Sequence, residues 1–314
     1  MSSSDQPEAL YQPRHEVRFI TAASLFDGHD AAINIMRRLL QAQGAEVIHL
    51  GHNRSVHEVV TAAVQEDVQG IALSSYQGGH IEYFKYLIDS LREAGRPDIK
   101  VYGGGGGVIV DREIAELEAY GVQKIFSPTD GQKLGLERMI NLLIKECDID
   151  LVQQQPPSVE NVILGDTVSL ARTITALETL ELDNQQRALL TEAASQHHAP
   201  VIGITGTGGS GKSSLTDELI RRFRLDQGDK FRIAVLAVDP TKRRSGGALL
   251  GDRIRMNAID SPQIFFRSLA TRGSNSEVPP PIPAAIEACR AAGFDLIIVE
   301  TPGIGQGDAA IVDV

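Results

Sequence analysis

The chain has few cysteines, few basic residues for its acidic content, and no long apolar run. Its 314 residues include two cysteines, Cys147 and Cys289, which lie far apart. This pattern argues against a disulfide framework and a cysteine-based zinc site, and it predicts a reducing, cytoplasmic environment. The 30 basic and 41 acidic residues give a net charge of −11, which argues against a nucleic-acid partner.

Membrane and secretion signals are also missing from the sequence. No apolar run approaches the roughly 18 residues of a membrane-spanning helix, and residues 1–16 are polar. We therefore expect a disordered leader and no membrane segment. With 42% apolar residues, the chain can build about two cores. We expect domains over 17–148 and 200–314, joined by a helical linker over 149–199.

In the first half, strand patterns alternate with helical ones. Strands are expected at Val17–Ser24, Glu46–Leu50, Gly70–Ser75, Lys100–Gly103 and Gln123–Phe126. Helices are expected at Asp30–Gln43, Val56–Glu66, Ile81–Ala94, Asp111–Ala119 and Lys133–Glu146. Five such units predict an α/β fold of the Rossmann type, with a parallel sheet in the flavodoxin-like strand order 2-1-3-4-5.

Polar and glycine-rich loops follow the strands of this predicted sheet. They cover residues 27–30, 74–80, 103–107 and 127–130. Loops that follow parallel strands share one edge of the sheet, where ligands bind. The five successive glycines at 103–107 suggest a backbone surface that something large approaches closely.

His29 is a candidate metal ligand in the first of these loops. Asp27, two residues earlier, is placed to hold its second ring nitrogen. One histidine does not complete a zinc site, which takes three or four protein ligands. A metal that arrives inside its own macrocycle needs only one axial ligand from the protein.

Three short motifs on this edge resemble the signatures of cobalamin-binding domains of the base-off, His-on class. They are Asp27-Gly28-His29, Ser74-x-Tyr76 and Gly106-Gly107. The resemblance implies that the histidine ligates cobalt, the serine hydrogen-bonds the detached dimethylbenzimidazole tail, and the glycines line its slot. Ala32 stands where the family has glycine and Tyr76 where it has leucine, so the slot is expected to differ in shape.

The second half begins with a phosphate-binding loop. Gly206 to Ser213 fits G-x-x-x-x-G-K-[ST], and it lies between the apolar run Val201–Thr205 and a helical pattern over Ser214–Arg224. Glycines let backbone N–H groups surround phosphate oxygens at a helix N-terminus. Lys212 is expected to reach the terminal phosphates and Ser213 to ligate magnesium.

Further chemistry follows the later strands of this half. Strands are expected at Arg232–Val238, Ile264–Ser268 and Asp295–Val299, and a helix at Ala284–Ala292. Asp239 ends the first of these strands, where a carboxylate suits magnesium. Glu300 begins a segment similar to the D-x-x-G element of GTPases, and Gln306 is a candidate water-positioning residue.

Together these residues resemble the GTPase chaperones of cobalamin mutases, that is, a P-loop GTPase α/β domain. The resemblance implies magnesium ligands Ser213, Asp239, Asp252 and Glu300, with the Val238 carbonyl and Thr301 close to them. It also implies phosphate contacts from Gly209, Ser210, Gly211, Lys212, Ser213 and Ser214, with Arg255 nearby. Pro302 stands where these relatives are expected to have a small residue, so we expect it to stiffen that segment.

The order of the two domains resembles the N-terminal part of the fused isobutyryl-CoA mutases. It implies adenosylcobalamin, GTP or GDP, and magnesium as cofactors. It also implies interconversion of isobutyryl-CoA and n-butyryl-CoA, an acyl-CoA site on a C-terminal domain, a homodimer, and delivery of cofactor by an adenosyltransferase. The guanine-reading motif N-K-x-D does not occur, so the preference for guanine rests on resemblance alone.

Three alternatives stay open at this point. A cobalamin sensor or carrier with a nucleotide switch would use the same two domains without mutase chemistry. A methylmalonyl-CoA-type mutase would differ only in substrate. A metal-insertion ATPase would keep the phosphate loop and use ATP.

Overall fold

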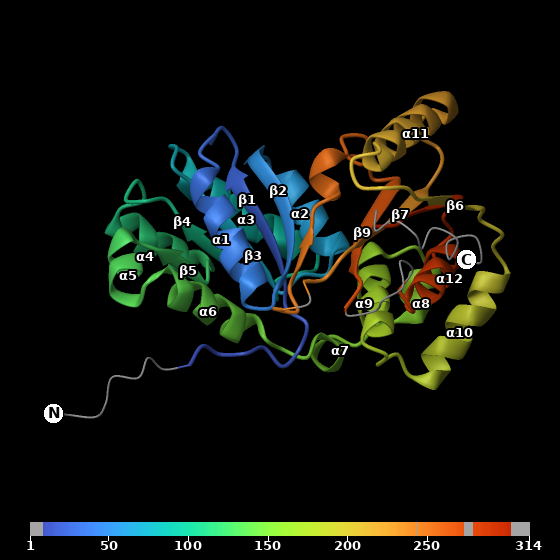
Figure 1. Ribbon diagram of the computed structural model, residues 1–314, viewed down its shortest axis with the longest axis horizontal. Coiled ribbons are helices and arrows are strands. Elements are labelled where there is room, and N and C mark those ends of the chain that lie inside the picture. The colour runs from blue at the N-terminus through green and yellow to red at the C-terminus, as the bar shows by residue number, and fades with distance from the viewer. Residues whose placement is uncertain (1–8, 243, 273–278, 303–314) are drawn as a thin grey trace.

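The computed structural model describes residues 9–242, 244–272 and 279–302. It contains two parallel β-sheets, each flanked by helices, which lie side by side (Figure 1). The α/β fold expected from the sequence is confirmed.

The first sheet has the strand order β5-β4-β3-β1-β2-β8. Five of its strands come from the first half: β1 (Arg18–Ser24), β2 (Glu46–Arg54), β3 (Gly70–Ser74), β4 (Lys100–Gly104) and β5 (Lys124–Phe126). These five adopt the predicted order 2-1-3-4-5. The sixth strand, β8 (Ala248–Leu250), comes from the second half of the chain. The sequence pattern did not predict it.

Helices cover both faces of the first sheet. One face packs on α2 (Val56–Gln65), α3 (His80–Glu93) and α4 (Asp111–Tyr120). The other packs on α1 (Ala31–Ala42) and α6 (Leu136–Cys147). The helix expected at Lys133–Glu146 is interrupted, because Gly135 adopts a φ of +75° between α5 (Pro128–Leu134) and α6. Helix α5 begins earlier because Ser127 and Asp130 form a capping box.

The second sheet has the order β6-β10-β7-β9. Its strands are β6 (Val201–Ile204), β7 (Ile233–Asp239), β9 (Ile264–Ala270) and β10 (Leu296–Glu300). Helix α11 (Lys212–Gln227) packs on one face. The linker contributes α7 (Leu151–Gln154), α8 (Val159–Ile163), α9 (Thr167–Glu178) and α10 (Asn184–Ser195). Of these, α8, α9 and α10 pack with α12 (Ile282–Ala291) on the other face.

Strand β8 physically joins the two halves. The chain leaves β7, pairs with β2 through residues 248–250, and returns at Gly251 to the second sheet. A Cβ at Gly247 would lie 2.2 Å from the Gln41 carbonyl oxygen and 2.8 Å from that of Ala45. Only glycine therefore allows the close approach that leads into β8.

The free edge of β9 is covered by side chains rather than by another strand. Gln65 donates from Nε2 to the Ile264 carbonyl at 2.9 Å and accepts from the Phe266 N–H at 3.3 Å. Glu66 accepts from the Ser268 N–H at 2.9 Å. These contacts satisfy backbone groups that an edge strand otherwise leaves unpaired.

A buried ionic cluster, here called the junction cluster, continues this contact. It consists of Arg18, Glu46, Glu66, Glu178, Arg253, Arg267 and Arg272. Arg18 contacts Glu46 at 2.6 Å and Glu178 at 3.1 Å. Since Glu178 belongs to α9, the cluster connects the first domain, the linker and the second sheet.

Within the described part of the chain, no helix combines the length and apolarity that crossing a bilayer demands.

Candidate functional site

His29 lies in the loop after β1 with its ring directed by Asp27. The Asp27 carboxylate is buried, and its Oδ1 lies 2.8 Å from His29 Nδ1 and accepts from the His29 N–H at 2.9 Å. The histidine side chain is 64% exposed. Because Nδ1 donates to the carboxylate, the Nε2 lone pair is left to ligate a metal.

Asp27 also joins the loops that follow β1 and β3. Its Oδ2 accepts from the Tyr76 N–H at 2.6 Å, and the rings of His29 and Tyr76 lie 5.7 Å apart. One buried carboxylate thus positions His29, the candidate metal ligand, against the loop that follows Ser74.

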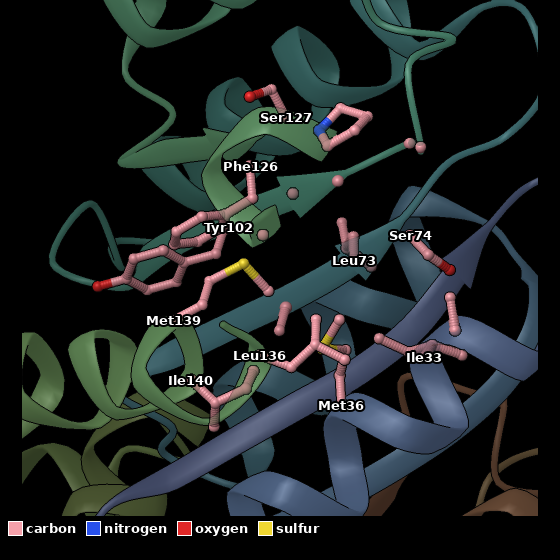
Figure 2. Close-up of a pocket in the computed structure, with 18 of the residues that line it drawn as sticks. Ile33, Met36, Leu73, Ser74, Tyr102, Phe126, Ser127, Leu136, Met139 and Ile140 are labelled. Atoms are coloured by element: carbon pink, nitrogen blue, oxygen red, sulfur yellow. The ribbon is translucent and has the colours of Figure 1, made fainter. Parts of the chain in front are cut away.

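Beside these loops lies a cavity of about 420 Å³, here called the slot. Its wall is formed by the ends of β3, β4 and β5 and by helices α1 and α6 (Figure 2). The side-chain Oγ of Ser74 is buried and has no hydrogen-bond partner among the residues that the structure describes. This hydroxyl, on the wall of an apolar cavity, is available to donate a hydrogen bond to an acceptor atom of a ligand that enters the cavity.

The glycines after β4 have a more local role than the sequence suggested. A Cβ at Gly105 would lie 2.3 Å from the Ser75 carbonyl oxygen, and one at Gly106 would lie 2.4 Å from the Tyr76 ring. Gly106 and Gly107 have φ values of +57° and +96°. At least two of the glycines are therefore required by neighbouring protein atoms, and Gly103 to Gly106 line the slot.

The phosphate-binding loop connects β6 to α11 as predicted. Gly209, Ser210, Gly211 and Ser214 are exposed, whereas Lys212 is half-buried and Ser213 is buried. Gly211 has no side chain to cap α11, so N–H groups of its first turn can face a phosphate. Lys212 donates from Nζ to the Gly206 carbonyl at 2.9 Å; binding a terminal phosphate would exchange this bond for an ionic one.

Carboxylates converge on Ser213 from two later segments. Its Oγ donates to Glu300 Oε1 at 2.7 Å and lies 3.3 Å from Asp252 Oδ1. Thr216, one helical turn later, donates to the other Glu300 oxygen at 2.9 Å. Thr216 was not predicted as a site residue, although its spacing of three residues from Ser213 places both on the same face of a helix.

Asp239 lies beside this group but is turned toward another partner. Its Oδ2 accepts from the Gly251 N–H at 3.0 Å. Burial, and then the charge of Asp252, raises the pKa of Asp239 to about 8. Burial also raises the pKa values of Asp252 and Glu300. A divalent cation would offset this unfavourable concentration of carboxyl groups.

In the described part of the chain, the carboxylates near Ser213 do not by themselves form a three-residue metal site, and the remaining candidate ligands are less closely gathered. Across residues 9–242, 244–272 and 279–302, no three His, Cys, Asp or Glu side chains are close enough together to hold a metal. Val238 is a buried strand residue before Asp239, and Thr301 is buried with an unpartnered hydroxyl. Arg255 contacts Asp252 at 3.1 Å and is 65% exposed. Gln306 lies outside the described residues.

Two protein-family models match this chain. The B12 binding domain matches residues 17–128, and the methylmalonyl Co-A mutase-associated GTPase MeaB matches residues 170–314. Both matches agree with the resemblances drawn from the motifs.

The relatives that match the chain include three named as fused isobutyryl-CoA mutases. Those from Nocardia farcinica and Cupriavidus metallidurans are each 66% identical, over 97% and 96% of this chain. One from Geobacillus kaustophilus is 60% identical over 97% of it. The chain spans 28%, 27% and 29% of the lengths of these three relatives, respectively.

Proposed function

The chain is related over nearly its whole length to the fused isobutyryl-CoA mutases and joins a B12-binding domain to a MeaB-type GTPase domain; from this premise we propose that it binds adenosylcobalamin and controls its loading through GTP hydrolysis. We further infer that it serves an acyl-CoA mutase that interconverts isobutyryl-CoA and n-butyryl-CoA. The observation that carries the proposal is the pairing of Asp27 and His29 beside a slot with an unpartnered Ser74 hydroxyl.

Residues at the ends of the first sheet's strands would hold the cofactor. His29 would ligate cobalt through Nε2, because Asp27 occupies Nδ1 and restricts the ring's rotation. The detached tail would enter the slot, where Ser74 would donate a hydrogen bond to it. Adenosylcobalamin supplies a cobalt–carbon bond whose homolysis starts radical rearrangements, and the protein's part is orientation and exclusion of water.

The residues of the second sheet would hold the nucleotide. The N–H groups that begin α11 and the Lys212 ammonium would bind phosphate oxygens. Ser213 would ligate magnesium, with Asp252, Glu300 and Asp239 around it. Val238 and Thr301 would complete the surroundings of the metal, and Arg255 would neutralise phosphate charge. Gln306 is proposed to position the attacking water, on the strength of the resemblance.

The acyl-CoA substrate is proposed to bind outside the two matched domains. The downstream reading frame distinguishes a mutase from a cobalamin sensor. Several hundred further residues with a barrel pattern would support the mutase, whereas a stop codon or a DNA-binding helix-turn-helix would support a cobalamin sensor. A homodimer and an adenosyltransferase partner belong to the same proposal.

The cofactor assignment is tested by electron paramagnetic resonance of the chain loaded with cob(II)alamin. We expect three-line nitrogen splitting, changing to two lines when the protein is labelled with nitrogen-15, because the axial nitrogen comes from His29. His29→Ala should remove this change. His57→Ala is the matched control, since His57 is exposed and its ring lies 3.7 Å from the Asp260 carboxylate. Splitting that stays the same after nitrogen-15 labelling would overturn the assignment of His29 as the cobalt ligand.

The nucleotide-binding assignment is tested on the same full chain. Lys212→Ala should abolish binding of a fluorescent GDP and leave the cobalamin spectrum of the loaded chain unchanged. Tighter binding of ATP than GTP would favour the metal-insertion ATPase instead.

A further inference from the structure

The turn between β1 and His29 holds Phe26 in an unfavourable backbone conformation. The Asp27 N–H donates to the Ser24 carbonyl at 3.0 Å and closes this turn, in which Phe26 has a φ of +65°. A turn with a positive φ at its third residue ordinarily has glycine there, because a larger side chain clashes with the backbone. Phe26 is 80% exposed, so its own packing contributes little to holding this conformation. The turn therefore depends on contacts from another part of the chain.

Asn53, near the end of β2, makes two hydrogen bonds to this turn. Its side-chain Oδ1 accepts from the Phe26 N–H at 2.8 Å, and its own N–H donates to the Asp27 carbonyl at 3.2 Å. The two bonds bracket the segment formed by Phe26 and Asp27. Asn53 has a φ of +56°, which asparagine adopts more readily than most residues do. The residue type at this position thus suits the pair of bonds that it makes.

The end of β2 that carries Asn53 is itself anchored to other elements. The carbonyl of the next residue, Arg54, accepts from the Tyr83 hydroxyl of α3 at 2.9 Å. A Cβ at Gly51 would lie 2.9 Å from Cδ1 of Ile254, so a side chain of the second half rests on the β2 backbone close to Asn53. Asn53 therefore reaches the turn from a fixed support.

We propose that Asn53 is a positioning residue for the cobalt ligand His29 and acts by holding the turn that carries Asp27. This inference rests on the proposed cobalamin function and deepens it. The Asp27 side chain is buried, and its two oxygens are engaged by His29 and by the Tyr76 N–H. If the backbone at Phe26 and Asp27 moved, the carboxylate would not keep both bonds. The His29 ring, which is 64% exposed, would then lose its orientation.

Two substitutions isolate the side-chain bond of Asn53 from its backbone. Asn53→Gly retains the positive φ and the N–H that donates to Asp27, and it removes the acceptor of the Phe26 N–H. Asn53→Asp retains an oxygen at the acceptor position and also tolerates the positive φ. The two variants therefore differ in the one bond that the proposal requires.

The test is spectrophotometric titration of the full chain with adenosylcobalamin. Asn53→Gly should weaken binding about tenfold, the value of one neutral hydrogen bond, and Asn53→Asp should bind within about twofold of the parent. Asp229→Gly is the matched control, because it also places glycine at a positive φ, of +55°, but lies beyond the end of α11 in the second half. It should leave the affinity unchanged, and an unchanged affinity in Asn53→Gly would overturn the inference.

A cycle with His29→Ala distinguishes positioning from a general effect on folding. Without the histidine, Asn53→Gly should change adenosylcobalamin affinity by no more than about twofold, because the ring that Asn53 helps to orient is gone. An equal loss with and without His29 would overturn the positioning role. If the parent chain itself shows no label-dependent nitrogen splitting with cob(II)alamin, the assignment of His29 as cobalt ligand fails before this inference is reached.

Phe26→Gly tests whether the turn is what Asn53 holds. Glycine adopts the positive φ without steric strain, so the turn would form with less help from Asn53. In the Phe26→Gly background, Asn53→Gly should therefore weaken adenosylcobalamin binding by less than about threefold instead of about tenfold. An undiminished loss would show that Asn53 does not act by holding this turn, and it would overturn the inference.

Discussion

Asp239 has a carboxyl group that the fold holds in its neutral form. Its pKa is raised from 3.8 to about 8, first by burial and then by Asp252. Because the folded pKa exceeds the unfolded one, the metal-free fold loses stability as the pH rises from about 4 to about 8. In its proposed role as a magnesium ligand, Asp239 would bind the ion as a carboxylate, so the ion would displace a proton.

Magnesium binding is therefore expected to release protons at neutral pH. Its affinity should rise up to about tenfold per pH unit between pH 6 and pH 8, since each unit changes the carboxylate fraction tenfold. Calorimetry of the GDP-loaded chain in two buffers of different ionisation enthalpy measures the release. Asp239→Asn should reduce it. A pH-independent affinity would show that Asp239 does not ligate the ion.

At the scale of single residues, local spacing predicted the short-range contacts. The Asp27–His29 pair and the placement of Ser213 on a helix follow from neighbours within three residues. The contacts of Ser213 with Asp252 and Glu300 join positions 39 and 87 residues apart. The family resemblance predicted that these three residues share a site, whereas residue spacing alone did not predict it.

At the scale of elements, Gly247 determines whether β8 reaches the first sheet. A methyl group there would meet the carbonyl oxygens of Gln41 and Ala45 at 2.2 and 2.8 Å. We expect Gly247→Ala to lower the free energy of unfolding by about 2–3 kcal/mol, as overpacking does. Denaturant titration of the full chain measures the change.

Gly251→Ala provides the control for that substitution. Among the described residues, a Cβ at Gly251 would meet the Leu249 side chain alone, at 3.9 Å, and the hydrogen bond from the Gly251 N–H to Asp239 would be kept. Stability within about 0.5 kcal/mol of the parent is expected, as for surface changes. Equal losses in both variants would argue against a specific role for the approach at Gly247.

Helix and strand positions were predictable where a pattern repeats over several residues. The five βα units predicted the order of five strands in the first sheet. Strand β8 has only three residues, Ala248–Leu250, and its partner β2 lies about 200 residues earlier. So short a run has no period to count, and its pairing depends on tertiary packing.

At the scale of the whole molecule, the junction cluster makes the two halves depend on each other. Burial alone would raise the pKa of Glu46, yet Arg272 and Arg18 together hold it below its usual value. The pKa of Glu178 is also lowered, chiefly by Arg18 against the effect of burial. This stability is present above the unfolded-state pKa of 4.5 and is lost as the pH falls below it.

Acid should accordingly unfold both halves in one transition. All six tyrosines lie within residues 1–148 and the chain has no tryptophan, so tyrosine fluorescence reports on the first half. Release of a fluorescent nucleotide reports on the second. The two curves should coincide, and in Glu178→Ala both should move to higher pH, because Arg18 and Arg267 lose a buried partner. Two separate midpoints would contradict the coupling.

The covered edge of β9 also limits how these proteins can be recombined. A laboratory graft with its breakpoint in the linker would separate Gln65 and Glu66 from the strand they cap, and β8 from β2. The transplanted second half would then expose unpaired backbone N–H and C=O groups of β9 to solvent, and these favour self-association. Exchange of domains between relatives should therefore succeed only when Gln65, Glu66 and β9 all come from the same parent protein.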